Sequence, residues 1–131
     1  MANRKETVLV VQQKNDWRDL LIHVIERCGY DVITVENPED IIESATHGLD
    51  IILLDLELVN ERAEMLIPQL QNCPSTQHIP IICEVRYGND LLAGRAIQAG
   101  AKEILYKPFD LSDLPSILRQ NLLQSTEKKL A

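Results

Sequence analysis

Short apolar runs alternate along the chain with longer segments in which apolar residues recur every three or four positions. The runs are too short and too rich in β-branched residues for helices, so they predict strands, and the longer segments predict amphipathic helices. The predicted strands span residues 7–11, 31–35, 51–55, 79–85 and 103–106. The predicted helices span residues 16–28, 37–46, 61–71, 90–98 and 112–122. This alternation is typical of an α/β protein, a flavodoxin-like doubly wound parallel sheet of five strands in the order 2-1-3-4-5 with five helices.

Length and composition favour one globular domain. The 131 residues are 45% hydrophobic and 25% charged, and we expect a core over about 7–123 followed by a short polar tail at 124–131. The longest apolar runs fall far short of the ~20 residues that span a bilayer, and the polar N-terminus lacks the apolar stretch of a secretory signal. We therefore expect a cytoplasmic protein without a membrane segment. The net charge of −7 disfavours binding to nucleic acid.

The ends of the predicted strands hold the candidate chemistry. In doubly wound sheets, ligands bind outside the carboxyl ends of the strands. Asp55 ends a strand that is otherwise apolar, where a carboxylate is costly unless it faces a cleft or a cation. Lys107 directly follows the last predicted strand and is a candidate counter-charge, and Asp16 is expected to cap the first helix.

Several segments together resemble the receiver domain of bacterial response regulators. They are residues 8–11, 50–55, 79–82 and 99–109, and the last is the most specific, with Ala-Gly-Ala followed by an apolar strand and Lys-Pro-Phe. The resemblance implies that Asp55 accepts a phosphoryl group from a histidine kinase and that Lys107 pairs with the phosphoryl oxygens. It also implies a Mg²⁺ ion held by Asp55 and an acidic pair after the first strand, and a cis bond between Lys107 and Pro108. A hydroxyl at the end of the fourth strand would bond the phosphoryl group and pull its loop inward.

The sequence departs from this family pattern at four positions. Gln12 and Gln13 stand where the acidic pair would be, Val85 replaces the hydroxyl, and Ile104 stands at the aromatic switch position. Neutral amides do not replace the charge of two carboxylates, so we expect weak Mg²⁺ binding at best, with Asp55 as the one protein carboxylate. The loss predicts phosphorylation slowed by roughly a thousandfold.

The retained scaffold and depleted chemistry predict a pseudo-receiver that acts by protein–protein interaction. Its partner would be a histidine kinase or a downstream signalling protein, bound through the face between Leu91 and Leu123. We expect no cofactor, and no enzyme activity beyond phosphorylation and dephosphorylation of Asp55.

Three alternatives stay open. The first is a phosphorylation-competent stand-alone response regulator that uses Asp55 and Lys107. In the second, a carboxylate from Asp16, Glu57 or Glu84 restores the metal site. The third and most remote is a flavodoxin-like cofactor protein, although residues 12–16 lack the Ser/Thr/Gly-rich cradle that a flavin phosphate needs.

Overall fold

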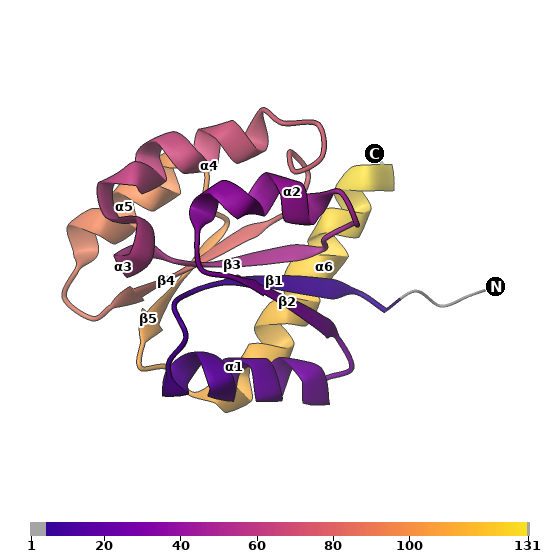
Figure 1. Cartoon of the computed structure of the whole chain (residues 1–131), viewed down its shortest axis with the longest axis horizontal. Coiled ribbons are helices and arrows are strands. Elements are labelled where there is room, and N and C mark those ends of the chain that lie inside the picture. Colours follow the sequence, from indigo (N-terminus) through magenta and orange to yellow (C-terminus); the bar gives the residue numbers. More distant parts are fainter. Residues whose placement is uncertain (1–4, 131) are drawn as a thin grey trace.

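The sheet has the predicted topology. The computed structural model describes residues 5–130, with side chains described through Leu123. Five parallel strands follow the order β2-β1-β3-β4-β5 (Figure 1). Their bounds are β1 Thr7–Val11, β2 Asp31–Val35, β3 Ile51–Asp55, β4 Ile81–Arg86 and β5 Glu103–Lys107. All five predicted strands are therefore present, and β4 begins two residues later than predicted.

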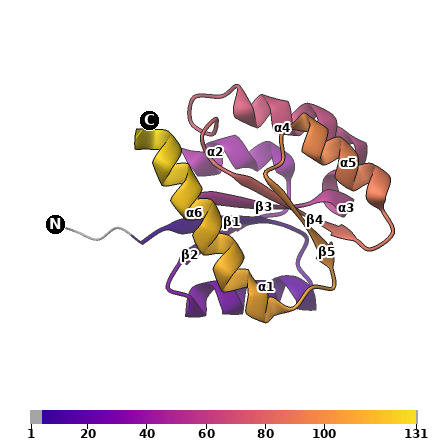
Figure 2. The ribbon, with the colours of Figure 1, turned by 180° about the vertical axis from the view of Figure 1, so that it is seen from behind.

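Helices cover both faces of the sheet, as Figures 1 and 2 show from opposite sides. α1 (Asp16–Arg27) and α6 (Leu114–Leu130) lie on one face, and α2 (Ile41–Ala45), α4 (Ala63–Gln71) and α5 (Asp90–Ala99) lie on the other. Each face has its own core of buried side chains. Among the described residues, no helix is both long enough and apolar enough to cross a bilayer.

Burial explains the composition of the strands. Every residue of β1 is buried, and so are the first four of β3, because these central strands pack against helices on both sides. β2 is an edge strand with partly exposed residues, as its mixed sequence suggested.

Short helical turns refine the predicted helices. One α-helical turn, α3 (Leu56–Val59), was not predicted, and 3₁₀ turns precede α2, α4 and α6 at Pro38–Asp40, Asn60–Arg62 and Leu111–Asp113. Asp110 caps the last of these 3₁₀ turns, because its side chain accepts a hydrogen bond from the Ser112 backbone N–H at 2.9 Å.

The last helix is longer than predicted. α6 continues to Leu130 through most of the segment interpreted as a polar tail. Residues 124–130 contain no glycine or proline, and a polar composition alone does not end a helix. The polar side chains of this tail, and residue 131, lie outside the described part of the chain.

Parallel pairing brings the predicted site residues to one edge of the sheet. Asp55 pairs in register with Glu84, and Arg86 pairs with Lys107. Gln12 directly follows β1, and its backbone N–H continues the ladder by donating to the Val35 carbonyl at 3.1 Å.

Candidate functional site at the carboxyl ends of the strands

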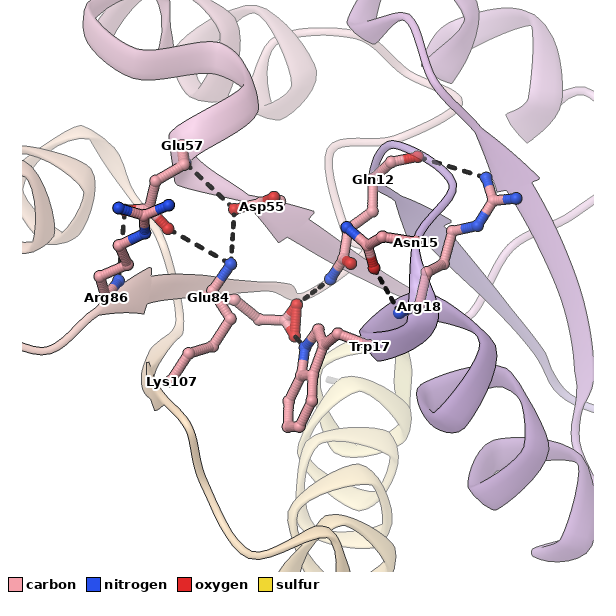
Figure 3. A network of polar contacts seen from close by, with 9 residues as sticks. All are labelled: Gln12, Asn15, Trp17, Arg18, Asp55, Glu57, Glu84, Arg86 and Lys107. Atoms are coloured by element: carbon pink, nitrogen blue, oxygen red, sulfur yellow. Dashed lines mark hydrogen bonds and ion pairs between the residues drawn. The ribbon is translucent and has the colours of Figure 1, made fainter.

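An ion pair joins the two residues that the sequence singled out. Lys107 Nζ lies 3.1 Å from Asp55 Oδ1, and the two side chains are only 19% and 14% exposed. Lys107 comes from β5, so its side chain reaches across the end of β4 to meet Asp55 on β3 (Figure 3). Burial favours the neutral amine, but the charges of Asp55 and Glu84 and hydrogen bonds to the carboxylates outweigh it and raise the pKa of Lys107 above 10.5. The site therefore contains a fixed positive charge.

Glu57 is a second carboxylate on the same lysine. Its Oε1 lies 3.3 Å from Lys107 Nζ, and its Oε2 accepts a hydrogen bond from the Arg86 backbone N–H at 3.2 Å. Asp55 is the N-cap of α3, because its Oδ1 accepts from the Glu57 backbone N–H at 3.1 Å. This cap places Glu57 in the first turn of α3, beside the end of β4.

Glu84 is a buried carboxylate in the centre of the edge. Its side chain is 0% exposed, and its Oε2 accepts a hydrogen bond from the side-chain amide of Gln12, which is 1% exposed. Its Oε1 accepts from the Trp17 indole N–H at 3.3 Å. Burial raises the pKa of Glu84 to about 7, against the lowering effects of the Trp17 hydrogen bond and the Lys107 charge.

The loop after β1 is fixed to the start of α1. Asn15, and not Asp16 as predicted, caps this helix, because Asn15 Oδ1 accepts a hydrogen bond from the Arg18 backbone N–H at 2.8 Å. Both residue types cap helices well, so the sequence alone left a one-residue ambiguity. Trp17 packs edge to face against Phe109, with ring centroids 5.1 Å apart. Trp17 thus joins α1 to β4 and to the loop after β5.

The other predicted pocket residues lie outside this network. Gln13 is exposed, although it follows Gln12 directly. Val85 is fully buried and Ile104 partly buried, and both belong to the core beneath α2, α4 and α5. Tyr106 pairs in register with Val85, and its ring stacks on that of Tyr87 with a centroid distance of 5.5 Å.

The donor set at this edge does not fit a divalent cation. Both Glu84 oxygens accept hydrogen bonds, and Asp55 Oδ1 is shared by Lys107 and the Glu57 backbone N–H. Gln12 Oε1 is buried and has no hydrogen-bond partner among the described residues, but it is a neutral oxygen. Among the side chains that the structure describes, residues 5–123, no group of three or more His, Cys, Asp or Glu is arranged to hold a metal ion. A hard cation needs several oxygen ligands, carboxylates among them, that are free to turn toward it.

Sequence reasoning undervalued Glu57 and Glu84. The sequence named them only as alternative metal ligands, whereas the register places Glu84 beside Asp55 and the α3 turn brings in Glu57. Asp16, the third carboxylate considered, takes no part in the network of Figure 3. The signal for Glu84 was present, because it is the one charged residue in the predicted strand 79–85. The bond between Lys107 and Pro108 is cis, as the resemblance implied.

Comparisons with known proteins agree with this geometry. The family model of the response regulator receiver domain matches residues 8–119. The DNA-binding transcriptional regulator NtrC of Bradyrhizobium sp. (strain RP501 Parasponia) is 27% identical over 123 residues, which are 93% of this chain and 25% of that protein. The transcriptional regulatory protein TdiR of Thauera aromatica is 32% identical over 113 residues, covering 82% of this chain and 47% of that protein. The chain thus spans less than half of the length of these relatives.

Solved structures share the fold. A response regulator from Thermotoga maritima superposes with a TM-score of 0.78 at 20% identity, over 91% of this chain and 98% of that one. The receiver domain of the sensor histidine kinase PA1611 from Pseudomonas aeruginosa PAO1, with a magnesium ion coordinated in its active-site cleft, gives a TM-score of 0.79 at 22% identity, covering 91% and 98%. The match over residues 8–119, with the topology and the Asp55–Lys107 pair, shows that the chain belongs to the response regulator receiver domain family.

Proposed function

We propose that this receiver acts as a protein-binding module whose activity does not depend on Mg²⁺-dependent phosphorylation of Asp55. The observation that carries the proposal is the pairing of charges at the sheet edge. Asp55 and Glu57 share Lys107, while Gln12 is committed to Glu84 and so contributes a neutral amide where the family has an acidic residue.

The electrostatics disfavour phosphoryl transfer to Asp55. A carboxylate attacks a polyanionic donor efficiently only when cations neutralise the charge between them. Lys107 is the one cation in contact with Asp55 among the described residues, and Glu57 already draws on its charge. If a metal ion ordinarily contributes several kcal/mol to this step, its loss slows the reaction by roughly a thousandfold.

The usual response to phosphorylation is also weakened. Val85 offers no hydroxyl to a phosphoryl group, and its side chain is fully buried in the core. Ile104 likewise replaces an aromatic switch with an aliphatic side chain that packs against this core. A phosphoryl group on Asp55 would therefore lack two of the contacts through which the family transmits its presence.

Binding to another protein is the function that the surface supports. Large apolar side chains are exposed on the two helices of the predicted segment, with Leu91 67% and Ile97 48% exposed on α5 and Leu123 59% exposed on α6. Apolar side chains of this kind supply the energy of many protein interfaces. The partner would be a histidine kinase or a downstream protein of a two-component pathway.

Four further expectations stay predictions: a cytoplasmic location, no binding to nucleic acid or membranes by this domain, no cofactor, and no enzyme activity beyond that at Asp55. The NtrC and TdiR proteins are named as transcriptional regulators, but this chain matches only 25% and 47% of them. We therefore expect any DNA-directed role to come from a partner or from a linked segment.

The second candidate function is an ordinary phosphoreceiver, and the retained Asp55–Lys107 pair at 3.1 Å favours it. Incubation with acetyl phosphate and Mg²⁺, followed over time by intact mass, separates the two functions. We expect no gain of mass in the wild-type protein or in the Asp55→Asn variant. A gain of one phosphoryl group that Asp55→Asn abolishes would establish the phosphoreceiver and refute the proposal.

A further inference from the structure

The Glu57 carboxylate lies where the Asp55 side chain, the Lys107 ammonium group and the end of β4 converge. Its backbone N–H donates to Asp55 Oδ1, and its side chain turns back over the edge of the sheet (Figure 3). Oε1 is buried and lies 3.3 Å from Lys107 Nζ, while Oε2 accepts from the Arg86 backbone N–H at 3.2 Å. One carboxylate therefore bridges the ends of β5 and β4.

These two contacts match the two tasks that the family resemblance assigns to phosphoryl oxygens. One task is to pair with the lysine at position 107, and the other is to draw the loop after the fourth strand toward the aspartate. Glu57 Oε1 makes the first contact. Glu57 Oε2 holds Arg86, the last residue of β4, through its backbone N–H. A carboxylate provides two anionic acceptor oxygens, so it can satisfy the same donors as a phosphoryl group.

We infer that Glu57 is a built-in anion that occupies the phosphoryl position beside Asp55 and holds the β4 loop in its drawn-in arrangement without phosphorylation. This inference rests on the proposed function and explains how a receiver could keep one binding-competent conformation. Glu57 is a positioning residue in this account, since it acts through Lys107 and Arg86.

The hydrogen bond between Glu57 and Arg86 is linked to the protein surface through Tyr87. Tyr87 follows Arg86, its backbone N–H donates to the Lys107 carbonyl at 3.3 Å, and its ring stacks on Tyr106. Tyr87 is 69% exposed and lies on the loop between β4 and α5, next to the face that includes Leu91. By fixing Arg86, Glu57 fixes the backbone from which Tyr87 projects toward a partner.

Two variants and a matched control test the role of Glu57. Glu57→Ala removes the bridge, whereas Glu57→Gln keeps the side-chain length and an acceptor oxygen but removes the charge. Glu61→Ala is the control, because Glu61 is an exposed acidic residue in the next turn of the same segment. A dispersed amide spectrum verifies that each variant is folded before it is compared.

The first measurement is amide hydrogen exchange at Arg86. We expect exchange at least about tenfold faster in Glu57→Ala than in the wild-type protein, because a charge-assisted hydrogen bond protects this N–H. Glu61→Ala should exchange like the wild-type protein. Equal Arg86 exchange in Glu57→Ala and the wild-type protein would refute the bridging role.

The second measurement is a titration with inorganic phosphate, followed by amide shifts at Arg86 and Lys107. We expect saturable shifts in Glu57→Ala and Glu57→Gln, because a phosphate can replace the missing anion, and none in the wild-type protein or Glu61→Ala. Wild-type shifts as large as those of the variants, or no shifts in either variant, would overturn the inference. Neither result concerns phosphoryl transfer to Asp55, so this inference can fail while the wild-type protein still takes up no phosphoryl group from acetyl phosphate.

Discussion

The side-chain amide of Gln12 donates a hydrogen bond to the carboxylate of Glu84, joining the end of β1 to the end of β4 inside the protein. The amide of Gln12 can donate a hydrogen bond to the Glu84 carboxylate, whereas the carboxylate of an aspartate at position 12 would repel that of Glu84. The absence of an acidic residue at position 12 and the presence of Glu84 in β4 are thus linked, because the two side chains are hydrogen-bonded to each other. The network that contains them includes Asp55 and Lys107 as well.

This pairing predicts that Gln12 contributes to stability and Gln13 does not. Gln12→Ala leaves the buried Glu84 carboxylate without one of its two donors, which should lower the free energy of unfolding by about 1–3 kcal/mol. Gln13→Ala is the matched control, since this neighbouring amide is exposed and should change stability by no more than about 0.5 kcal/mol. Urea denaturation above the Glu84 pKa measures both. Equal effects of the two substitutions would contradict the network.

Glu84 should make stability depend on pH near neutrality. Its pKa is about 7 in the folded protein and 4.5 ordinarily, so between these values the folded protein keeps a proton that the unfolded chain releases. The stabilisation from this proton is fully present below about pH 4.5 and is lost as the pH rises through about 7. Urea denaturation across this range should show a loss of about 3 kcal/mol in the wild-type protein relative to Glu84→Gln. A constant difference between the two proteins would show that Glu84 does not titrate there.

Trp17 should report the same titration optically. It is the only tryptophan in the chain, and its indole N–H donates to Glu84 Oε1. Excitation moves electron density away from the pyrrole ring of indole, so a negative charge beside that ring stabilises the excited state. The emission maximum should move to longer wavelength as the pH rises, with a midpoint near 7. The step should be absent in Glu84→Gln, and its persistence there would assign it to another group.

Lys107 should stabilise the fold through the two carboxylates that it pairs. Lys107→Met leaves Asp55 and Glu57 close together without their cation, at 14% and 23% side-chain exposure. The expected loss is about 1–3 kcal/mol in the free energy of unfolding, between the values for exposed and for buried ion pairs. Lys102→Met removes an exposed lysine just before β5 and should cost no more than about 0.5 kcal/mol. Similar losses in both variants, measured by urea denaturation, would exclude a specific role for the ion pair.

The fold could be predicted from sequence because its signals are local and strong. The buried strands β1 and β3 are almost continuous apolar runs, and the five predicted helices correspond to α1, α2, α4, α5 and α6. Element ends were less certain. Asn15 and Asp16 are both good caps, so the start of α1 was uncertain by one residue. Residues 124–130 contain no helix-stop signal, so the sequence did not mark where α6 ends.

The site was predictable only in part, because it depends on the directions of side chains as well as on the positions of residues in the sequence. The Asp55–Lys107 pair followed from the family resemblance, and the structure brings the two together. Whether Gln12 or Gln13 faces inward, and whether Glu57 turns back over the sheet, depends on the register and on the α3 turn that Asp55 caps. These are tertiary features that apolar periodicity does not encode.

The central claim, that the protein's own residues already occupy the cation and phosphoryl positions at this edge, is tested most directly by an amide NMR titration with Mg²⁺ and then beryllofluoride, a phosphoryl mimic. We predict that the amides of Asp55, Glu57, Arg86 and Lys107 keep their positions, because Glu57 and Lys107 already supply the anion and the cation. Saturable shifts centred on these four amides would show that a metal ion and a phosphoryl group are accommodated there, and would contradict the account.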